Sequence, residues 1–435
     1  MGGGSLRLVF HVAYCKIDRT ILQSATRLFS LLSLIQACYN FSKCLSHAEL
    51  RSFFYPAGLA MKRYMTDQVR QDLAGKVVLL TGPRQVGKTW LSRNLFDEKE
   101  TVYLNYDNET HRRVILDQSW SRDADLVIFD EIHKRKNWKR WLKGVFDVEG
   151  VRPRLMVTGS ARMDVWRKGG DSLAGRHFLC RLHPISISEA VKETGIPPRE
   201  ALDRLMDVGG FPEPFLKGTK GYAQRWRRSH LERILKEDLL DLERVSDLKS
   251  VEVLVQLLSE RVGAPVSFSS LARDLEVSPH TVKRWIGILE SLYVVFVIRP
   301  WTAKLSKSIL KEPKIYFYDT GRVRGDESSR WENLVACHLL KWVHYRQDVS
   351  GENTDLFYLR DKEKREVDFA IVHERKPEIL VEVKTSESTM THLKYFAAKT
   401  GAKKAFHLPL APVTEPRQLG IVKTVDAAKW LGGLI

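Results

Sequence analysis

The segment GPRQVGKT, residues 82–89, constrains the fold more than any other part of the sequence. It follows the apolar run KVVLLT, and the segment after it, WLSRNLF, has helical spacing. This is the GxxxxGK[ST] pattern, in which glycines let backbone N–H groups point at phosphate oxygens. Lys88 is expected to reach the terminal phosphates and the Thr89 hydroxyl to ligate Mg²⁺. The predicted nucleotide-binding residues of this loop are Gly82, Pro83, Arg84, Gln85, Val86, Gly87, Lys88 and Thr89.

A second buried-strand pattern, DLVIFDE at residues 125–131, ends in two adjacent acids. Because it follows a phosphate loop, we expect Asp130 to hold Mg²⁺, directly or through water. Glu131 is then the candidate general base for the attacking water. A third strand pattern, RLMVT, leads to Ser160; either Thr158 or Ser160 is a candidate to sense the γ-phosphate, and an ordinary polar turn explains them equally well.

Arg176, in the string LAGR, is an arginine near the same sheet. It is a candidate catalytic arginine finger, acting in cis or across a subunit interface, and the alternative is a solvated loop arginine.

These strings together resemble a family of AAA+-superfamily ATPases of bacteria and archaea that carry a C-terminal domain of unknown function. The matching strings are TGPRQVGKT, DEIH, TGSAR, LAGR, HPISISE, GGFP, YDTG and the pair EVDFAIV and EILVEVK. The resemblance spans about residues 61 to 430. It implies ATP binding and hydrolysis, with ATP and Mg²⁺ as cofactors, and no known cellular task.

Residues 263–310 have the order helix, turn, helix and strand, which predicts a winged helix-turn-helix. His280, Lys283 and Arg284 would lie on the outer face of its second helix. They are candidates for contacts with the DNA backbone, since no Asn or Gln accompanies them for base reading. The same module also serves only as a packing or relay unit in multidomain ATPases, and that reading stays open.

The order helix, three strands, helix and strand over residues 311–435 is that of the restriction-endonuclease-like core. If the hairpin of strands 365–372 and 378–384 has an even register, Asp368 lies opposite Glu382 on one face. Two carboxylates this close are unfavourable without a cation, so Mg²⁺ is expected between them. The pattern resembles the PD-(D/E)xK nuclease signature, although the literal PD dipeptide is absent. The resemblance implies a site made of Glu332, Asp368, Glu382 and Lys384; a hairpin held only by surface ion pairs is the alternative.

The chain of 435 residues has a net charge of +17, which favours a polyanionic partner, DNA before a membrane. Five scattered cysteines without a CxxC pair indicate neither a disulfide framework nor structural zinc, and favour the cytoplasm. Residues 1–60 are Ser-rich and acid-poor, and we expect a poorly ordered extension rather than a targeting segment. The apolar run at residues 28–41 is too short to span a bilayer.

The predicted fold class is α/β multidomain. A P-loop NTPase domain with an AAA+-like parallel sheet occupies residues 61–190, followed by a helical linker or lid (191–262), the winged helix-turn-helix (263–310) and the nuclease-like domain (311–435). The leading interpretation is an ATPase that acts on or binds DNA and carries a metal-dependent nuclease domain. The alternative is a regulatory NTPase switch whose C-terminal domain binds without cleaving, with a second copy or a protein partner.

Overall fold

The computed structural model describes residues 61–96, 100–159, 173–239, 248–302, 311–386 and 390–435. The predicted N-terminal extension, residues 1–60, and Ser160 lie outside these ranges. The description below concerns the unit formed by Lys62–Ile435.

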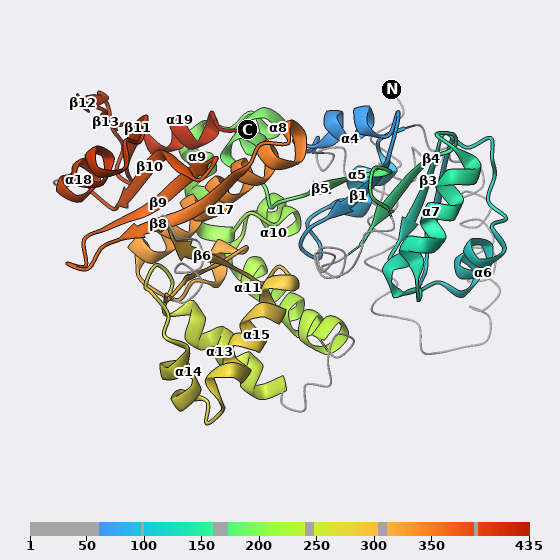
Figure 1. The fold of residues 1–435 in the computed structure, drawn as a ribbon, viewed down its shortest axis with the longest axis horizontal. Coiled ribbons are helices and arrows are strands. Elements are labelled where there is room, and N and C mark those ends of the chain that lie inside the picture. Colours follow the sequence, from blue (N-terminus) through green and yellow to red (C-terminus); the bar gives the residue numbers. More distant parts are fainter. Residues whose placement is uncertain (1–60, 97–99, 160–172, 240–247, 303–310, 387–389) are drawn as a thin grey trace, which may run out of the picture. The chain divides into compact units, whose positions relative to one another are not determined.

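A five-stranded parallel sheet carries the phosphate loop, with the strand order β2-β3-β4-β1-β5 (Figure 1). Its strands are β1 (Val77–Thr81), β2 (Thr101–Asn105), β3 (Leu126–Asp130), β4 (Arg154–Thr158) and β5 (His177–Arg181). The three central strands are buried along almost their whole length, as expected for a parallel sheet covered on both faces. They are the three strands predicted from apolar runs, whereas the edge strands β2 and β5 were not predicted.

Helices cover the two faces of this sheet. Val77, Leu79, Val127 and Phe129 point to the face covered by α6 (Glu109–Asp117) and α7 (Trp138–Glu149). Val78, Leu80, Leu126 and Ile128 point to the opposite face, where α4 (Thr66–Asp72) and α5 (Lys88–Arg93) pack. The alternation along each strand therefore places apolar side chains in two separate cores.

A helical region follows the first sheet. It contains α8 (Ile187–Thr194), α9 (Pro198–Val208), α10 (Pro212–Lys217), α11 (Lys220–Arg233), a π-helix η5 (Ile234–Leu239) and α13 (Leu248–Ser259). The segment GGFPEP, residues 209–214, has the glycines and prolines of a loop, but its last three residues begin α10, because Pro212 is well placed in a first helical turn. Helix α11 begins at Lys220 and changes to a π-helix at Ile234.

The helix-turn-helix segment consists of α14 (Phe268–Asp274) and α15 (Pro279–Ser291), followed by β6 (Val295–Pro300). The side chain of Ser278 caps α15 by accepting a hydrogen bond from Thr281 N at 3.0 Å. β6 pairs antiparallel with β7 (Lys314–Phe317) and parallel with β8 (Thr354–Arg360). One sheet therefore continues across the domain boundary predicted at residue 310.

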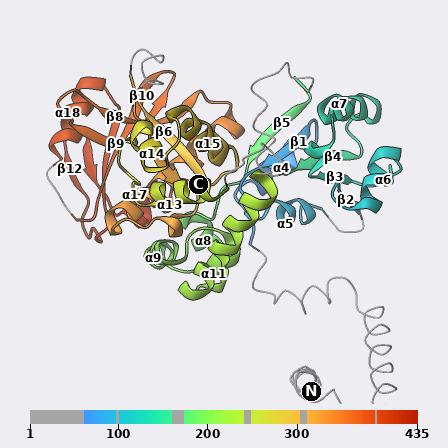
Figure 2. The same cartoon turned by 90° about the horizontal axis from the view of Figure 1, so that it is seen from below.

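This second sheet has eight strands in the order β12-β13-β11-β10-β9-β8-β6-β7 (Figure 1). The remaining elements are η6 (Thr320–Arg322), α17 (Glu327–Ser350), β9 (Glu366–His373), β10 (Lys376–Lys384), α18 (Thr391–Thr400), β11 (Lys404–Pro409), β12 (Arg417–Leu419), β13 (Val422–Thr424) and α19 (Ala427–Gly432). Parallel and antiparallel pairs are mixed in it. Helix α11, the yellow-green helix near the centre of Figure 2, contacts both the phosphate loop and η6.

Candidate functional site

The phosphate loop adopts a backbone that requires glycine at two positions. Gly82 has φ 143° and Gly87 has φ 101°, values that residues with a Cβ rarely adopt. A Cβ at Gly82 would lie only 2.2 Å from the carbonyl oxygen of Leu182. The loop then enters α5 at Lys88, so its shape is the strand–loop–helix arrangement that cradles phosphates.

A pocket of about 490 Å³ opens beside this loop. Its predicted lining residues are Arg84, Gln85, Gly87, Lys88, Thr89, Asp130 and Glu131, whereas Gly82, Pro83 and Val86 shape the loop without lining the pocket. The Lys88 ammonium is buried and donates to the carbonyl oxygens of Gly82 at 2.8 Å and Pro83 at 2.7 Å. The glycine cradle and this polar lining fit a nucleotide with its Mg²⁺.

Asp130 is held in place by side chains of neighbouring strands. The Thr158 hydroxyl donates to Asp130 Oδ1 at 2.6 Å, and the Tyr103 hydroxyl donates to Oδ2. Asn105 Nδ2 donates to the same Oδ2 at 3.4 Å. Since both carboxylate oxygens already accept hydrogen bonds, the geometry favours Mg²⁺ held through water over direct ligation. The hydroxyl of Thr158, a candidate to sense the γ-phosphate, is thus used on Asp130. Tyr103 and Asn105 were not predicted from the sequence.

Glu131 has the electrostatic environment of a general base. It follows β3 with φ 56°, and it lines the pocket. Burial, with a smaller contribution from Asp130, raises the pKa of Glu131 to about 7, against the opposing charge of Lys88. A carboxylate with a pKa near the working pH is well suited to take a proton from water.

Arg176 lies at the opposite end of the strands from the phosphate loop, which is unsuitable for an arginine finger acting within the same chain. β1 and β5 run parallel in register, with Val77 opposite His177, and Val77 N donates to the carbonyl oxygen of Arg176. Arg176 therefore stands at the start of these strands, whereas the phosphate loop follows Thr81 at their end. The separation is about 13 Å along the strand at 3.3 Å per residue. Its guanidinium pairs with Asp147 instead, at 2.6 Å. The cis role is contradicted, and a role across a subunit interface stays a prediction.

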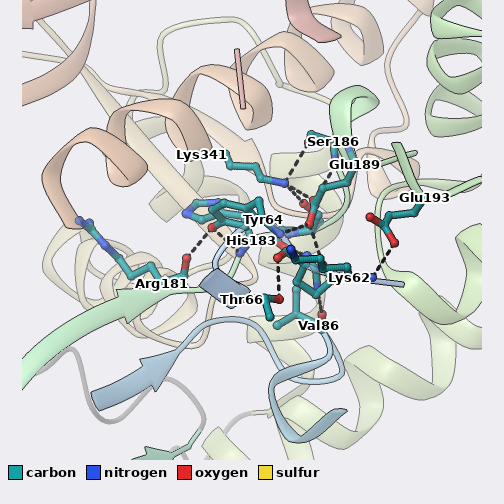
Figure 3. Close-up of polar contacts among 12 residues, drawn as sticks. Lys62, Tyr64, Thr66, Val86, Arg181, His183, Ser186, Glu189, Glu193 and Lys341 are labelled. Atoms are coloured by element: carbon teal, nitrogen blue, oxygen red, sulfur yellow. Dashed lines mark hydrogen bonds and ion pairs between the residues drawn. The ribbon is translucent and has the colours of Figure 1, made fainter. Parts of the chain in front are cut away.

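A buried ion cluster holds the phosphate loop from one side (Figure 3). Arg63 donates to Val86 O at 2.5 Å and to Glu189 Oε1 at 2.9 Å. The other oxygen of Glu189 accepts from Lys341 of α17, which also donates to Ser186 Oγ at 3.0 Å. The cluster thus connects a loop carbonyl to the long helix of the C-terminal region.

A second contact holds the loop through α11. Arg322 donates to Nδ1 of His230 at 3.1 Å, so the proton of this ring lies on Nε2, which donates to Arg84 O at 3.1 Å. Burial, together with the charge of Arg322, lowers the pKa of His230 to about 3, consistent with a neutral ring. Arg322 and Arg227 both pair with Asp319.

The segments GGFP (209–212) and YDTG (318–321) pack against each other at this contact. A Cβ at Gly209 would lie 2.4 Å from Asp319 Oδ1, and a Cβ at Gly321 would lie 1.8 Å from Arg227 Nη2. These glycines are therefore explained by close packing around one buried ion pair.

The C-terminal hairpin brings the predicted acidic residues together. Val381 pairs with Phe369, so Glu382 and Asp368 are the next residues of the two strands, in the even register. Lys384 Nζ lies 3.4 Å from Glu382 Oε1 and 3.7 Å from Asp368 Oδ2.

Glu332, Glu366, Asp368 and Glu382 form an acidic centre. A lysine that was not predicted from the sequence lies among these acids. Lys314 of β7 is fully buried, and its Nζ lies 2.6 Å from Glu366 Oε1, 3.1 Å from Glu332 Oε1 and 3.7 Å from Asp368 Oδ1. Within the described ranges, no group of three or more His, Cys, Asp or Glu residues could hold a metal ion. The Mg²⁺ predicted at Asp368 and Glu382 does not fit this pairing, because Lys314 faces Asp368 Oδ1 while Lys384 faces both Asp368 Oδ2 and Glu382 Oε1.

The DNA-contact candidates lie where the helical spacing predicted. His280, Lys283 and Arg284 are exposed on α15, whereas Val282 and Leu289 are buried. None of the helices in the described part of the chain combines the length and apolar character needed to cross a bilayer.

Three segments of the chain match known domain families. Residues 74–191 match an AAA domain, residues 199–324 match a domain of unknown function (DUF8612), and residues 328–425 match another (DUF4143).

Relatives occur in bacteria and archaea. The chain is 30% identical over 247 residues to an uncharacterized protein of Mycobacterium tuberculosis, covering 56% of this chain and 54% of the relative. It is 22% identical over 342 residues to an uncharacterized protein of Methanocaldococcus jannaschii, covering 71% of this chain and 75% of the relative. It thus spans about half the length of the mycobacterial relative.

Among solved structures, the Aeropyrum pernix Orc1 protein in complex with DNA is similar with a TM-score of 0.32 and 14% identity. That match covers 66% of this chain and 96% of the Orc1 chain. From the family models, the chain contains an AAA domain followed by segments that match two domains of unknown function, and the relatives named above in bacteria and archaea are uncharacterized.

Proposed function

We propose that the protein binds ATP with Mg²⁺ at the phosphate loop and hydrolyses it. The observation that carries this proposal is the position of Glu131, a carboxylate with a raised pKa, in the same pocket as Lys88, Thr89 and Asp130. Lys88 and the backbone N–H groups of the loop would hold the phosphates, and Thr89 with Asp130 would hold the metal. Mg²⁺, when bound, supplies positive charge that offsets the charge of the phosphates.

Glu131 would take the proton of the attacking water. Its carboxylate needs to be ionised for this step, and the nearby Lys88 favours that form. Asp130 stays fixed by Thr158 and Tyr103 throughout, so the metal-binding group needs no rearrangement during the reaction.

ATP turnover by the purified chain tests this proposal. Lys88→Ala should lower turnover at least about 100-fold, the order expected for the loss of one charge-stabilising group. Lys192→Ala, an exposed lysine of α8, is the matched control and should leave turnover unchanged. Undiminished turnover in Lys88→Ala would show that the phosphate-loop assignment is wrong.

The partner that the charge favours is nucleic acid, with DNA first. A net charge of +17 and the exposed Lys283 and Arg284 of α15 support this part of the proposal. The order α14, turn, α15, β6 and β7 supports a winged helix-turn-helix, whose second helix would meet the DNA backbone.

Binding of a labelled DNA duplex at several salt concentrations tests the partner. Lys283→Ala should weaken binding at all sequences and reduce the slope of log affinity against log salt by about 1. Lys423→Ala, an exposed lysine of β13, is the control. Absence of binding at low salt would contradict the DNA proposal while leaving the ATPase proposal intact.

The C-terminal order α17, β8, β9, β10, α18 and β11 supports a restriction-endonuclease-like core. Of the two functions considered for it, the lysine in the acidic centre favours a binding module that does not cleave.

A further inference from the structure

Lys314 is a buried cation that faces several acids. Its side chain is 1% exposed, and three carboxylates from two elements, Glu332 of α17 and Glu366 and Asp368 of β9, lie within 3.7 Å of its Nζ. The three carboxylates compensate the charge of the buried ammonium.

The rest of the fold fixes this ammonium in place. Lys314 pairs with Ile298 in the β6–β7 ladder, so its backbone cannot swing away without breaking the sheet. Its Nζ lies 5.5 Å from the centre of the Tyr358 ring. The hydroxyl of Tyr316, two residues along on the same face, donates to Glu332 Oε1 at 2.6 Å and orients that carboxylate toward the lysine.

The other oxygens of Asp368 and Glu382 differ in their surroundings. Asp368 Oδ2 accepts a hydrogen bond from Val383 N at 2.8 Å, while its Oδ1 faces Lys314. Glu382 is buried; its Oε1 faces Lys384, whereas its Oε2 has no hydrogen-bond partner among the described residues. The centre thus has the carboxylates of a cation site, and a lysine stands at the position where those carboxylates converge.

We propose that Lys314 is the resident cation of this centre, that no divalent metal binds there, and that the C-terminal domain does not cleave phosphodiesters by metal catalysis. Three carboxylate oxygens face the Nζ position at 2.6 to 3.7 Å, whereas hard divalent ions need oxygen ligands at about 2.0–2.6 Å. With the ammonium removed, these carboxylates should be able to move inward and bind a divalent ion, which they cannot do in the native chain. The inference does not depend on ATP hydrolysis.

Titration of the nucleotide-free, full-length protein with Mn²⁺, followed by the EPR signal of the free ion, tests the proposal. Wild type and Asp368→Asn should bind Mn²⁺ equally, since any ion held at the phosphate loop is common to both. Lys314→Met should gain one ion per chain, and the double variant Lys314→Met with Asp368→Asn should lose that gain.

Two variants serve as controls. Lys314→Arg keeps the charge and should gain no ion. Lys384→Met removes the other lysine, whose side chain is 41% exposed, while leaving Lys314, and should gain none either. Thermal unfolding followed by circular dichroism identifies variants that fold.

Either of two results would overturn the proposal: Mn²⁺ binding by wild type that Asp368→Asn abolishes, or a folded Lys314→Met that binds no additional ion. If Lys314→Met does not fold, the comparison of wild type with Asp368→Asn still shows whether the native centre binds a divalent ion. Failure of this test leaves ATP turnover untouched, because the phosphate loop contributes none of these residues.

Discussion

Glu189→Gln is the substitution for which the structure gives the most definite energetic expectation. The Glu189 side chain lies between two buried cations, Arg63 and Lys341, all three at most 3% exposed. It also accepts from Tyr64 N at 3.0 Å. Burial alone would raise the pKa of Glu189, but Arg63 and Lys341 lower it to about 2, so the carboxylate is charged at neutral pH.

The magnitude follows from what the variant leaves uncompensated. Breaking a buried ion pair by removing one partner costs about 3–5 kcal/mol. Lys341 can escape part of this cost, because burial already lowers its pKa to about 8 and loss of the Glu189 charge lowers it further. Arg63 cannot lose its proton. We therefore expect a loss of about 3 kcal/mol in the free energy of unfolding, at the lower end of that range.

Urea unfolding measures this loss, with Glu193→Gln as the matched control. Glu193 lies one turn further along α8, is exposed, and accepts only from Lys62 N in the contacts described, so its substitution should change stability by less than about 0.5 kcal/mol. Equal unfolding midpoints for the two variants would refute the reasoning, because the buried charge would then contribute nothing that an exposed one does not.

Three further predictions concern the same sites. Glu131→Gln should abolish ATP turnover while nucleotide binding persists, and wild-type turnover should rise as the pH increases through about 7, where Glu131 becomes ionised; a steady-state pH profile checks both. His230→Ala should raise the KM for ATP more than it lowers kcat, because it removes the donor to Arg84 O, and His230→Gln should recover part of the effect. The stabilisation from Glu189 is present above its ordinary pKa of 4.5 and is lost as the pH falls toward about 2, so acid unfolding of Glu189→Gln should depend less on pH over that window.

The sequence predicted the centre of the first sheet and missed its edges for one physical reason. β1, β3 and β4 are covered on both faces and read as continuous apolar runs. β2 and β5 stand at the two edges and are only partly buried, so their residues, TVYLN and HFLCR, mix polar and apolar types. Such a pattern does not distinguish an edge strand from a loop.

The even hairpin register, which the sequence analysis could only assume, has a cause that the sequence does not show. The chain turns through Glu374 and Arg375, both with positive φ, and Lys376 pairs with His373. If the pairing set by this two-residue turn continued along the strands, Asp368 would lie opposite Val381 instead of Glu382. An irregularity between Pro377 and Ile379 shifts the pairing by one residue and gives the even register. Without this bulge the acids of the two strands would point to opposite faces.

The residues missed at both sites come from other parts of the chain than the motifs. Tyr103 and Asn105 reach Asp130 from the neighbouring strand, and Lys314 reaches the acidic centre from β7. A local motif predicts its own residues because their spacing carries the chemistry. A motif carries no information on which distant side chain the sheet order brings beside it, and here that side chain is a lysine that pairs with a carboxylate predicted to hold a metal.

The phosphate loop is held by donors that belong to other segments, and this links the two sheets mechanically. Arg63 fixes Val86 O and is tied through Glu189 to Lys341, while His230 fixes Arg84 O and is tied through Arg322 to η6. Lys341 and Glu332 belong to the same helix, α17, about 14 Å apart at 1.5 Å per residue. A helix packed along its length moves as one body. Displacement of Val86 O on nucleotide binding must therefore either break the buried hydrogen bond from Arg63 or shift the ion cluster that connects Arg63 through Glu189 to Lys341 of α17.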